Sequence, residues 1–450
     1  MQSRQASLHQ PLGTRRRLRF SGHGRAIWRR ALIFIKNSGV LALSGSTKTS
    51  YRRLQLAVWA ATLITMYFDI DYWWRVVRHV WGLRGWHKRT SMLVRLILWI
   101  PLRTLLHSAC FVLDYLFFPR LWTQRVERPV FIVGHARSGT TLVHRLMGAD
   151  GETFSYFLYW EMFFPSLLQK KVIRGAGWLD ARLLGGSLNR KLKAWDEKTF
   201  GPYRHMHYMS LWNPEEDCFA MAAAFVSQQW SLDIPMMNVV DFFHLDGMPV
   251  KRRRWMHHYR ELVKRQLLLN GGDKAHLSKN PVMSGWLDAL IETFPDARIV
   301  VMMRDPAECM PSCLKLVQVT WKGKGWQPDD YALSLELLTE ISFEHFEHPR
   351  QVLSRHEQTP QIVVDYRELT AAPRETVHSI YEALNLDMTE RLDSWLLAQA
   401  EREKKHQGKF EYSLGEFFLR SDDIYARLKV FYEQYQWPVP NTQQGDHVND

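Results

Sequence analysis

Short apolar runs alternate with longer helical patterns in the C-terminal two thirds of the chain. Residues 129–133 and 298–304 are rich in β-branched and other apolar residues, as buried parallel strands are, and residues 275–278 form a shorter run of this kind. Helical periodicity is found at residues 142–147, 251–270, 283–294, 329–347, 373–384 and 415–435. This alternation predicts an α/β fold, in which helices flank a parallel sheet.

The N-terminal part of the chain follows a different pattern. Residues 54–68 form a stretch of 15 residues without a charge. As a helix this stretch would span about 22 Å, which is short of the roughly 30 Å of a bilayer's hydrocarbon core. Residues 92–118 are also apolar, but charged side chains interrupt them and Pro101 is predicted to break the helix. Neither stretch predicts a convincing membrane-spanning helix.

Charge is distributed unevenly along the chain. The net charge is +13, yet residues 1–125 hold 21 Lys and Arg against three Asp and Glu, while the remaining residues hold 38 against 43. The basic character therefore belongs to the N-terminal region. This argues against a nucleic-acid partner for the body and favours an anionic partner such as a membrane surface. Eight of the 19 Trp lie in the first 122 residues, which is typical of interfacial helices.

These patterns divide the chain into four regions. We expect a disordered basic arm at 1–50, an apolar and amphipathic helical region at 51–125, an α/β domain at 126–440 and a disordered tail at 441–450. For the helical region, three alternatives stay open: membrane-interfacial helices, a helical cap packed on the α/β domain, or a short signal-anchor. A mitochondrial transit peptide is a further alternative for the start of the chain.

The location of the protein is predicted from its cysteines and glycosylation signals. Four Cys without a Cys-x-x-Cys pair, and no Asn-x-Ser/Thr acceptor, favour a reducing compartment. We therefore expect a cytoplasmic protein, peripheral on or anchored to a membrane, with a Golgi-type signal-anchor protein as the alternative.

A glycine-bounded loop follows the first predicted strand. It runs from Gly134 to Gly139 and leads into a helical pattern, so its N–H groups and the helix dipole favour an anion. The spacing G-x-x-x-x-G-x-T matches the nucleotide-triphosphate P-loop, but Thr140 stands where that loop has its Lys. Here the cation is Arg137, inside the loop. The loop is predicted to bind an anion other than magnesium-bound ATP.

Two further cations follow predicted strands. Arg304 ends the run 298–304, and Ser312 lies one to two helical turns after Pro306. Because ligands bind at the carboxyl ends of strands in open α/β sheets, Arg304 is a candidate phosphate ligand. The alternative is a surface ion pair with Asp305 or another acid. Lys279 follows the run 275–278 and is a candidate for neutralising charge on a transferring group, with a plain surface lysine as its alternative.

Together these segments resemble sulfotransferases that use 3′-phosphoadenosine 5′-phosphosulfate (PAPS), in the bacterial-type branch related to the tyrosylprotein sulfotransferases. The segments that carry the resemblance are FIVGHARSGTTLVHRLM at 131–147, NPEED at 213–217, LSKNP at 277–281, ARIVVMMRDP at 297–306, VVDYREL at 363–369 and a closing stretch at 404–414. The resemblance covers roughly residues 126–420. It implies a P-loop-like parallel sheet and transfer of a sulfonate from PAPS to a hydroxyl group without a metal.

The resemblance also implies a role for each matching residue. Lys279 would contact the sulfonate or the bridging oxygen. Arg304 and Ser312 would hold the 3′-phosphate, and Tyr366 would lie near the nucleotide. The 5′-phosphosulfate would be bound by the loop residues Arg137, Ser138, Gly139, Thr140 and Thr141.

The general base is less well defined. Glu161 lies in an aromatic stretch, where a raised pKa would suit a proton acceptor, and it is the nearest match to the base of the tyrosylprotein enzymes. A purely structural Glu161 is the alternative. His135 is a second candidate, and the pair His205 and His207, which could also line the acceptor pocket or bind a metal, is a third. The acidic run 215–217 fits a helix start or an acceptor contact.

Two other functions stay open at this point: a P-loop kinase or NTPase, and a non-catalytic membrane-associated protein that binds PAP, the desulfonated nucleotide. For the sulfotransferase, the aromatic stretch 154–164 and the N-terminal region suggest an apolar, lipid-linked, carbohydrate or phenolic acceptor.

Overall fold

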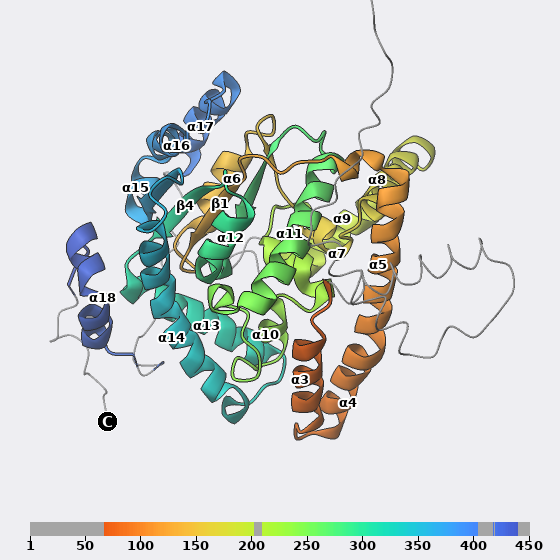
Figure 1. The fold of residues 1–450 in the computed structure, drawn as a ribbon, viewed down its shortest axis with the longest axis horizontal. Coiled ribbons are helices and arrows are strands. Elements are labelled where there is room, and N and C mark those ends of the chain that lie inside the picture. The colour runs from red at the N-terminus through yellow and green to blue at the C-terminus, as the bar shows by residue number, and fades with distance from the viewer. Residues whose placement is uncertain (1–66, 202–208, 404–416, 418, 440–450) are drawn as a thin grey trace, which may run out of the picture. The chain divides into compact units, whose positions relative to one another are not determined.

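A five-stranded parallel sheet forms the centre of the protein (Figure 1). The computed structural model describes residues 67–201, 209–403, 417 and 419–439, which belong to one compact unit that begins at Ala60. The predicted arm at 1–50 and tail at 441–450 lie outside the described residues. The strand order is β2-β3-β1-β4-β5, with β1 (Val130–Gly134), β2 (Phe154–Ser155), β3 (Ala275–Lys279), β4 (Arg298–Met303) and β5 (Gln361–Asp365). The α/β fold and the strands predicted at 129–133, 275–278 and 298–304 are confirmed, whereas the short strand β2 was not predicted.

The strand register brings functional segments to one edge of the sheet. Ile132 of β1 pairs with Lys279 of β3, and Gly134 pairs with Met302 of β4. On the far side of β4, Met303 pairs with Asp365. Because all these pairs are parallel, the carboxyl ends of β3, β1, β4 and β5 are neighbours. The segments that follow these four strands therefore start side by side.

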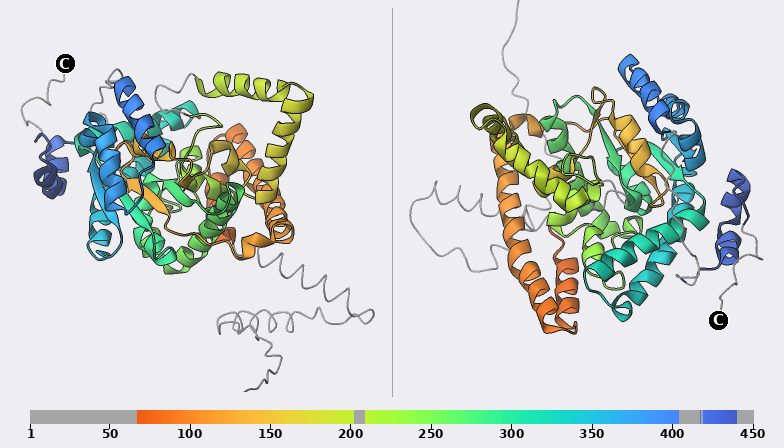
Figure 2. Two further views of the ribbon diagram at one scale, coloured as in Figure 1. Left: turned by 90° about the horizontal axis from the view of Figure 1, so that it is seen from above. Right: turned by 180° about the vertical axis from the view of Figure 1, so that it is seen from behind.

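Helices cover both faces of the sheet (Figures 1 and 2). Phe131 and Val301 belong to a core shared with α11 (Pro249–Leu269), α12 (Leu287–Thr293), α13 (Pro306–Gly323) and α14 (Pro328–Leu353). Their strand neighbours Ile132 and Val300 face the opposite way, toward α6 (Thr140–Gly148), α16 (Pro373–Ala383) and α17 (Glu390–Glu403). Successive strand residues point to opposite faces of the sheet. Because helices cover both faces, the strand residues on both faces are apolar.

The other elements connect this framework or extend it. They are α7 (Tyr159–Phe163), α8 (Leu167–Leu183), α9 (Ser187–Phe200), α10 (Gln229–Asp233), α15 (Tyr366–Ala371), α18 (Ser421–Tyr435) and the 3₁₀ helices η2 (Pro119–Trp122), η4 (Asp217–Ala224), η5 (Leu245–Gly247) and η6 (Pro281–Trp286).

The first described helices are α3 (Ile70–Trp81), α4 (Trp86–Val94), the π-helical turn η1 (Arg95–Trp99) and α5 (Ile100–Phe117). The last three follow one another without the break that was predicted. Pro101 is the second residue of α5 and does not interrupt the helical stretch Lys88–Phe117. The wider turn η1 directly precedes Pro101, and a π turn removes the need for the hydrogen bond that proline cannot donate. The prediction of a break at Pro101 is therefore wrong.

Buried carboxylates attach these helices to the rest of the protein. Asp69 is fully buried and accepts hydrogen bonds from Lys251 (2.9 Å) and from the Trp255 indole (2.9 Å), both on α11. Asp114 of α5 is also fully buried and binds the Arg265 guanidinium at 2.8 Å. Its carboxylate additionally accepts from Ser166, Leu167 and Leu168 at the start of α8. The inner side of residues 67–125 is thus a cap packed on the α/β domain, one of the three alternatives.

We predict that Asp114→Asn strongly destabilises the protein. The substitution leaves the buried Arg265 with one carboxylate fewer, and breaking a buried ion pair costs on the order of 3–5 kcal/mol of the free energy of unfolding. Urea denaturation followed by circular dichroism measures the change. Glu127→Gln is the control, because Glu127 pairs with Arg125 only on the surface. Equal midpoints for the two variants would show that Asp114 does not anchor the helices.

Candidate active site

The loop between β1 and α6 has an unusual backbone. Gly134 and Gly139 have φ angles of +125° and +93°, and Arg137 also takes a left-handed conformation, with φ +71°. A Cβ on Gly134 would lie 2.2 Å from the carbonyl oxygen of Met302 on β4. One on Gly139 would lie 2.5 Å from the ring of Tyr366. The loop is therefore held closely between β4 and Tyr366, and both glycines are needed for this approach.

The loop leads into α6, whose N-terminal amides lie at its far end. Helix α6 begins at Thr140, after Gly139. The first amides of a helix have no acceptor within it and form its positive end, so Thr140 and Thr141 can offer N–H groups to an anion. The Ser138 hydroxyl instead donates to the carbonyl oxygen of His135 at 2.6 Å and closes the loop internally. Of the predicted loop residues, Ser138 thus has a structural contact.

Arg137, Arg304, Ser312 and Tyr366 form one cluster. The Nε of Arg137 donates to the Ser312 hydroxyl at 3.1 Å, and the Arg304 guanidinium donates to the carbonyl oxygen of Arg137, also at 3.1 Å. Arg304 lies over the ring of Tyr366, 4.4 Å from its centroid. The strand register brings together three segments that follow the neighbouring strands β1, β4 and β5. Ser312 of α13 completes the cluster.

Arg304 also makes the surface ion pair that was its alternative, but not with Asp305. Its guanidinium contacts Glu308, one turn into α13, at 2.8 Å. Asp305 instead caps α13 and accepts a hydrogen bond from Tyr432 of α18 at 2.9 Å. Because the side chain of Glu308 is 58% exposed, an incoming phosphate could displace it at little cost.

Lys279 at the end of β3 is buried, so the alternative of a surface lysine is wrong. Its side chain is 1% exposed, and Nζ lies 3.2 Å from Glu216 and 3.7 Å from Glu215. Burial works against the ammonium, but the two carboxylates outweigh it and raise the pKa of Lys279. Lys279 therefore stays charged at the strand end next to the loop.

Glu161 makes a full set of structural contacts. One carboxylate oxygen of this buried side chain accepts from the Leu158 amide (3.0 Å) and from Gln266 of α11 (2.8 Å). The other pairs with Arg174 of α8 at 2.9 Å. The carboxylate thus caps α7 and joins three helices, which is the structural alternative for this residue.

The histidine candidates have little support as bases. His135 is buried and stacked on Phe346, with ring centroids 5.3 Å apart, and burial lowers its pKa to about 4. Such a group is a weak proton acceptor at neutral pH. His205 and His207 lie in 202–208, outside the described residues.

Glu216 is a candidate that the sequence did not single out. Asp217 turns inward and binds His276 at 2.7 Å, and Glu215 is buried, whereas the side chain of Glu216 is 21% exposed and contacts Lys279. Of the acids in the run 215–217, Glu216 thus combines access with contact to the catalytic lysine candidate. The run of three consecutive acids was the sequence signal for a functional carboxylate here, because the start of a helix needs no more than one acidic residue.

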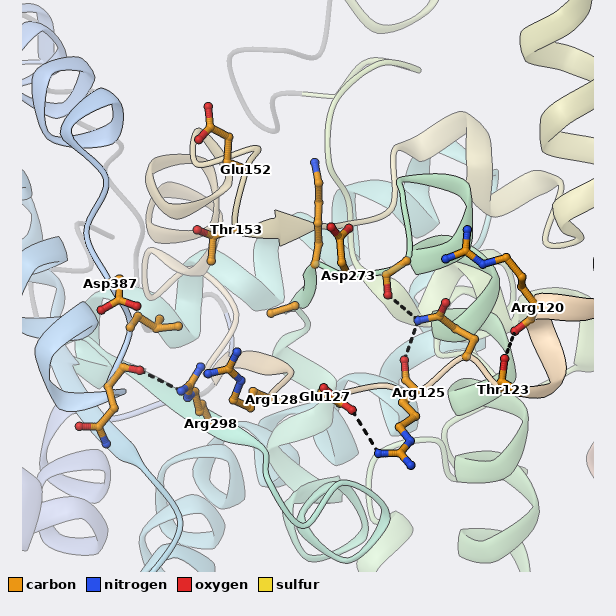
Figure 3. A pocket seen from close by; sticks show the side chains of 16 residues that line it. Arg120, Thr123, Arg125, Glu127, Arg128, Glu152, Thr153, Asp273, Arg298 and Asp387 are labelled. Carbon is orange, nitrogen blue, oxygen red and sulfur yellow. Dashed lines mark hydrogen bonds and ion pairs between the residues drawn. The ribbon is translucent and has the colours of Figure 1, made fainter.

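A hollow lies at the amino ends of the strands, opposite the cluster (Figure 3). It measures about 470 Å³ and is lined by residues at the amino ends of the strands, among them Arg128, Arg298, Asp273 and Glu152. Its charges are mixed, and ligands of open α/β sheets bind at the carboxyl ends. The hollow is therefore not our candidate site.

The fold and the cluster define an α/β protein with a glycine-bounded loop and several cations at the carboxyl ends of its strands. The family model of the sulfotransferase family matches residues 129–390, more than half of the chain. The chain belongs to the sulfotransferase family.

Two solved structures share the fold. Sulfotransferase STF9 from Mycobacterium avium is 17% identical, with a TM-score of 0.58 over 75% of this chain and 86% of that one. Sulfotransferase STF1 from Mycobacterium tuberculosis H37Rv is 20% identical, with a TM-score of 0.58 over 82% and 96% of the two chains. No match was found among curated proteins.

We predict that Glu161→Gln affects stability rather than turnover. Loss of the charge-assisted bond to Arg174 should lower the free energy of unfolding by about 1–3 kcal/mol, while kcat of the folded fraction stays within about twofold, because contacts to a structural group are not part of the reaction. Thermal denaturation and sulfonate-transfer assays measure the two effects. The control is Glu152→Gln, an exposed partner of Arg391. A stable Glu161→Gln variant with greatly reduced kcat would identify Glu161 as the base after all.

Proposed function

We propose that the protein transfers a sulfonate group from PAPS to a hydroxyl acceptor. The observation that carries this proposal is the arrangement of Arg137, Arg304 and Lys279 at neighbouring strand ends, the first two joined by a hydrogen bond. A P-loop kinase is the weaker alternative, because Thr140 stands in place of the phosphate-binding lysine and the chain belongs to the sulfotransferase family.

The residues present fit the nucleotide. When bound, PAPS supplies an activated sulfonate on its 5′-phosphate. The amides of Thr140 and Thr141, with Arg137, would bind that phosphate. Gly139 lies so close to the ring of Tyr366 that only glycine fits there, and this contact fixes the shape of the loop backbone. Arg304 and Ser312 would bind the 3′-phosphate. The Arg137–Ser312 bond links the two anion sites.

Lys279 and Glu216 would carry out the transfer. Lys279 holds a positive charge, which would stabilise the negative charge that develops between sulfonate and leaving phosphate. Glu216 would accept the hydroxyl proton as the acceptor oxygen bonds to sulfur and the bond to the leaving phosphate oxygen breaks. Its partial exposure supports this role.

We further propose that the acceptor is an amphiphile and that the protein works as a peripheral, cytoplasmic protein at a membrane surface. Among the described residues, Lys88–Phe117 is the one helix long and apolar enough to cross a membrane. Its inner side holds Asp114 and Phe111 against the protein core, which favours lying along the membrane over crossing it. Its outward side exposes Leu98, Trp99, Leu102, Leu106 and Leu116.

The helices that follow also have exposed apolar side chains. Helix α8 packs beside α5, as the hydrogen bond between His107 and Gln169 shows (Figures 1 and 2). Helices α8 and α9 expose Trp178, Leu183, Leu192 and Trp195. The basic N-terminal region adds attraction to anionic lipids. The free thiols of the four cysteines suit the cytoplasm.

The donor assignment predicts nucleotide binding without a metal. We expect isothermal titration to detect PAP binding at roughly micromolar Kd without magnesium, and ATP to bind much more weakly. Arg304→Ala should raise the KM for PAPS by about 10- to 100-fold, since a charge-assisted phosphate contact is lost. Arg391→Ala, an exposed control, should behave like wild type. Binding of ATP only with magnesium, or an unchanged KM for Arg304→Ala, would contradict the assignment.

The base assignment predicts a loss of turnover alone. Glu216→Gln should lower kcat by about 10²- to 10⁴-fold, whereas PAP affinity measured by titration stays close to that of wild type. Glu152→Gln is the control, because it removes an exposed carboxylate, the partner of Arg391, without removing the base. Wild-type kcat for Glu216→Gln would exclude this residue as the base.

A further inference from the structure

A small pocket lies between the N-terminal helices and the segment that follows Glu216. Its volume is about 70 Å³, several times the roughly 10–15 Å³ of probe-occupied space that one water needs. Arg95 and Arg103 line it from η1 and α5, and Tyr159, Phe163, Phe219 and Trp230 provide aromatic walls. Two arginines thus line a small space with largely aromatic walls.

The pocket has an excess of positive charge. Arg95 pairs with Asp233 at 2.8 Å, and Lys324 contacts the same carboxylate. Within the described part of the chain, Arg103 has neither an ion-pair nor a hydrogen-bond partner, although it is partly buried. Burial and the nearby Arg95 lower the pKa of Arg103. Arg95 and Lys324 therefore share one carboxylate, and an added oxyanion would relieve the repulsion between Arg95 and Arg103.

The pocket lies between the catalytic residues and the outward apolar side. The backbone N–H of Phe219 on η4 donates to the Glu216 carbonyl oxygen at 3.0 Å. Burial and the nearby Glu215 carboxylate raise the pKa of Tyr159. On the other side, Leu102 and Leu106 of α5 are exposed and share a helix with Arg103. A ligand held by Arg103 could thus have one end near Glu216 and the other along α5.

We propose that Arg95 and Arg103 bind the oxyanion group, phosphate or carboxylate, of an amphiphilic acceptor whose apolar part lies on the exposed side of α5. Arginine suits this role because its planar donors match both oxyanions in a bidentate manner. The aromatic walls would exclude water and strengthen the interaction. The assignment rests on the proposed function, since it makes the bound amphiphile the acceptor.

Direct binding tests this proposal with the full chain. The probes are short-chain phosphatidic acid, the matching uncharged diacylglycerol and inorganic phosphate, each titrated below the concentration at which it aggregates. We expect wild type to bind phosphatidic acid best. Arg103→Gln should weaken that binding by about 10- to 100-fold, the effect of one charge-assisted contact. The control Arg84→Gln removes an exposed charge in the turn between α3 and α4 and should change the affinity less than about twofold.

PAP titration of each variant separates the possible failures. Retained PAP binding in Arg103→Gln shows that the fold and the donor site are intact, so weaker phosphatidic acid binding then reports on the pocket. Equal weakening by Arg84→Gln would reduce the effect to general charge attraction and overturn the proposal. Equally tight binding of diacylglycerol or inorganic phosphate would overturn the assignment to an anionic amphiphile. If the wild-type protein itself did not bind PAP, that result would instead contradict the donor assignment.

Discussion

Parallel pairing of four neighbouring strands is the constraint on which the candidate site depends. Because β3, β1, β4 and β5 end at the same edge, each following segment contributes one group: Lys279, the loop with Arg137, Arg304 and Tyr366. None of these groups needs a long loop to reach the others. The contact between Arg304 and the Arg137 carbonyl, across 167 positions of sequence, is a direct consequence of the register.

Charge compensation determines how this edge can hold so many cations. Lys279 is stabilised by Glu215 and Glu216, and Arg304 by Glu308. The compensating groups differ in access: Glu215 is buried and Glu216 is only partly exposed, while Glu308 is largely exposed. An anionic nucleotide can replace the second kind of partner easily and the first only with difficulty. The same edge can therefore be stable alone and still receive phosphates.

The sequence predicted those parts of the site that depend on local pattern. The strands, the Gly134–Gly139 loop and the cation after β4 each follow from a few consecutive residues, and they are found where expected. Glu161 shows the limit of this reasoning, because its partners Arg174 and Gln266 belong to other helices and no local pattern reveals them. Glu216 was missed for the same reason, since its contact with Lys279 joins residues 63 positions apart.

The π-helical turn at Arg95–Trp99 has a geometric consequence for the helix that contains it. In an ordinary α-helix, residues eight apart point in directions about 80° from each other. A π turn inserts roughly one extra residue, so Arg95 and Arg103 are oriented much like residues seven apart, which differ by only about 20°. If the same residues formed an ordinary α-helical turn, Arg103 would instead point about 80° away from Arg95. The wider turn thus acts as an angular adjustment that keeps both arginines in one sector.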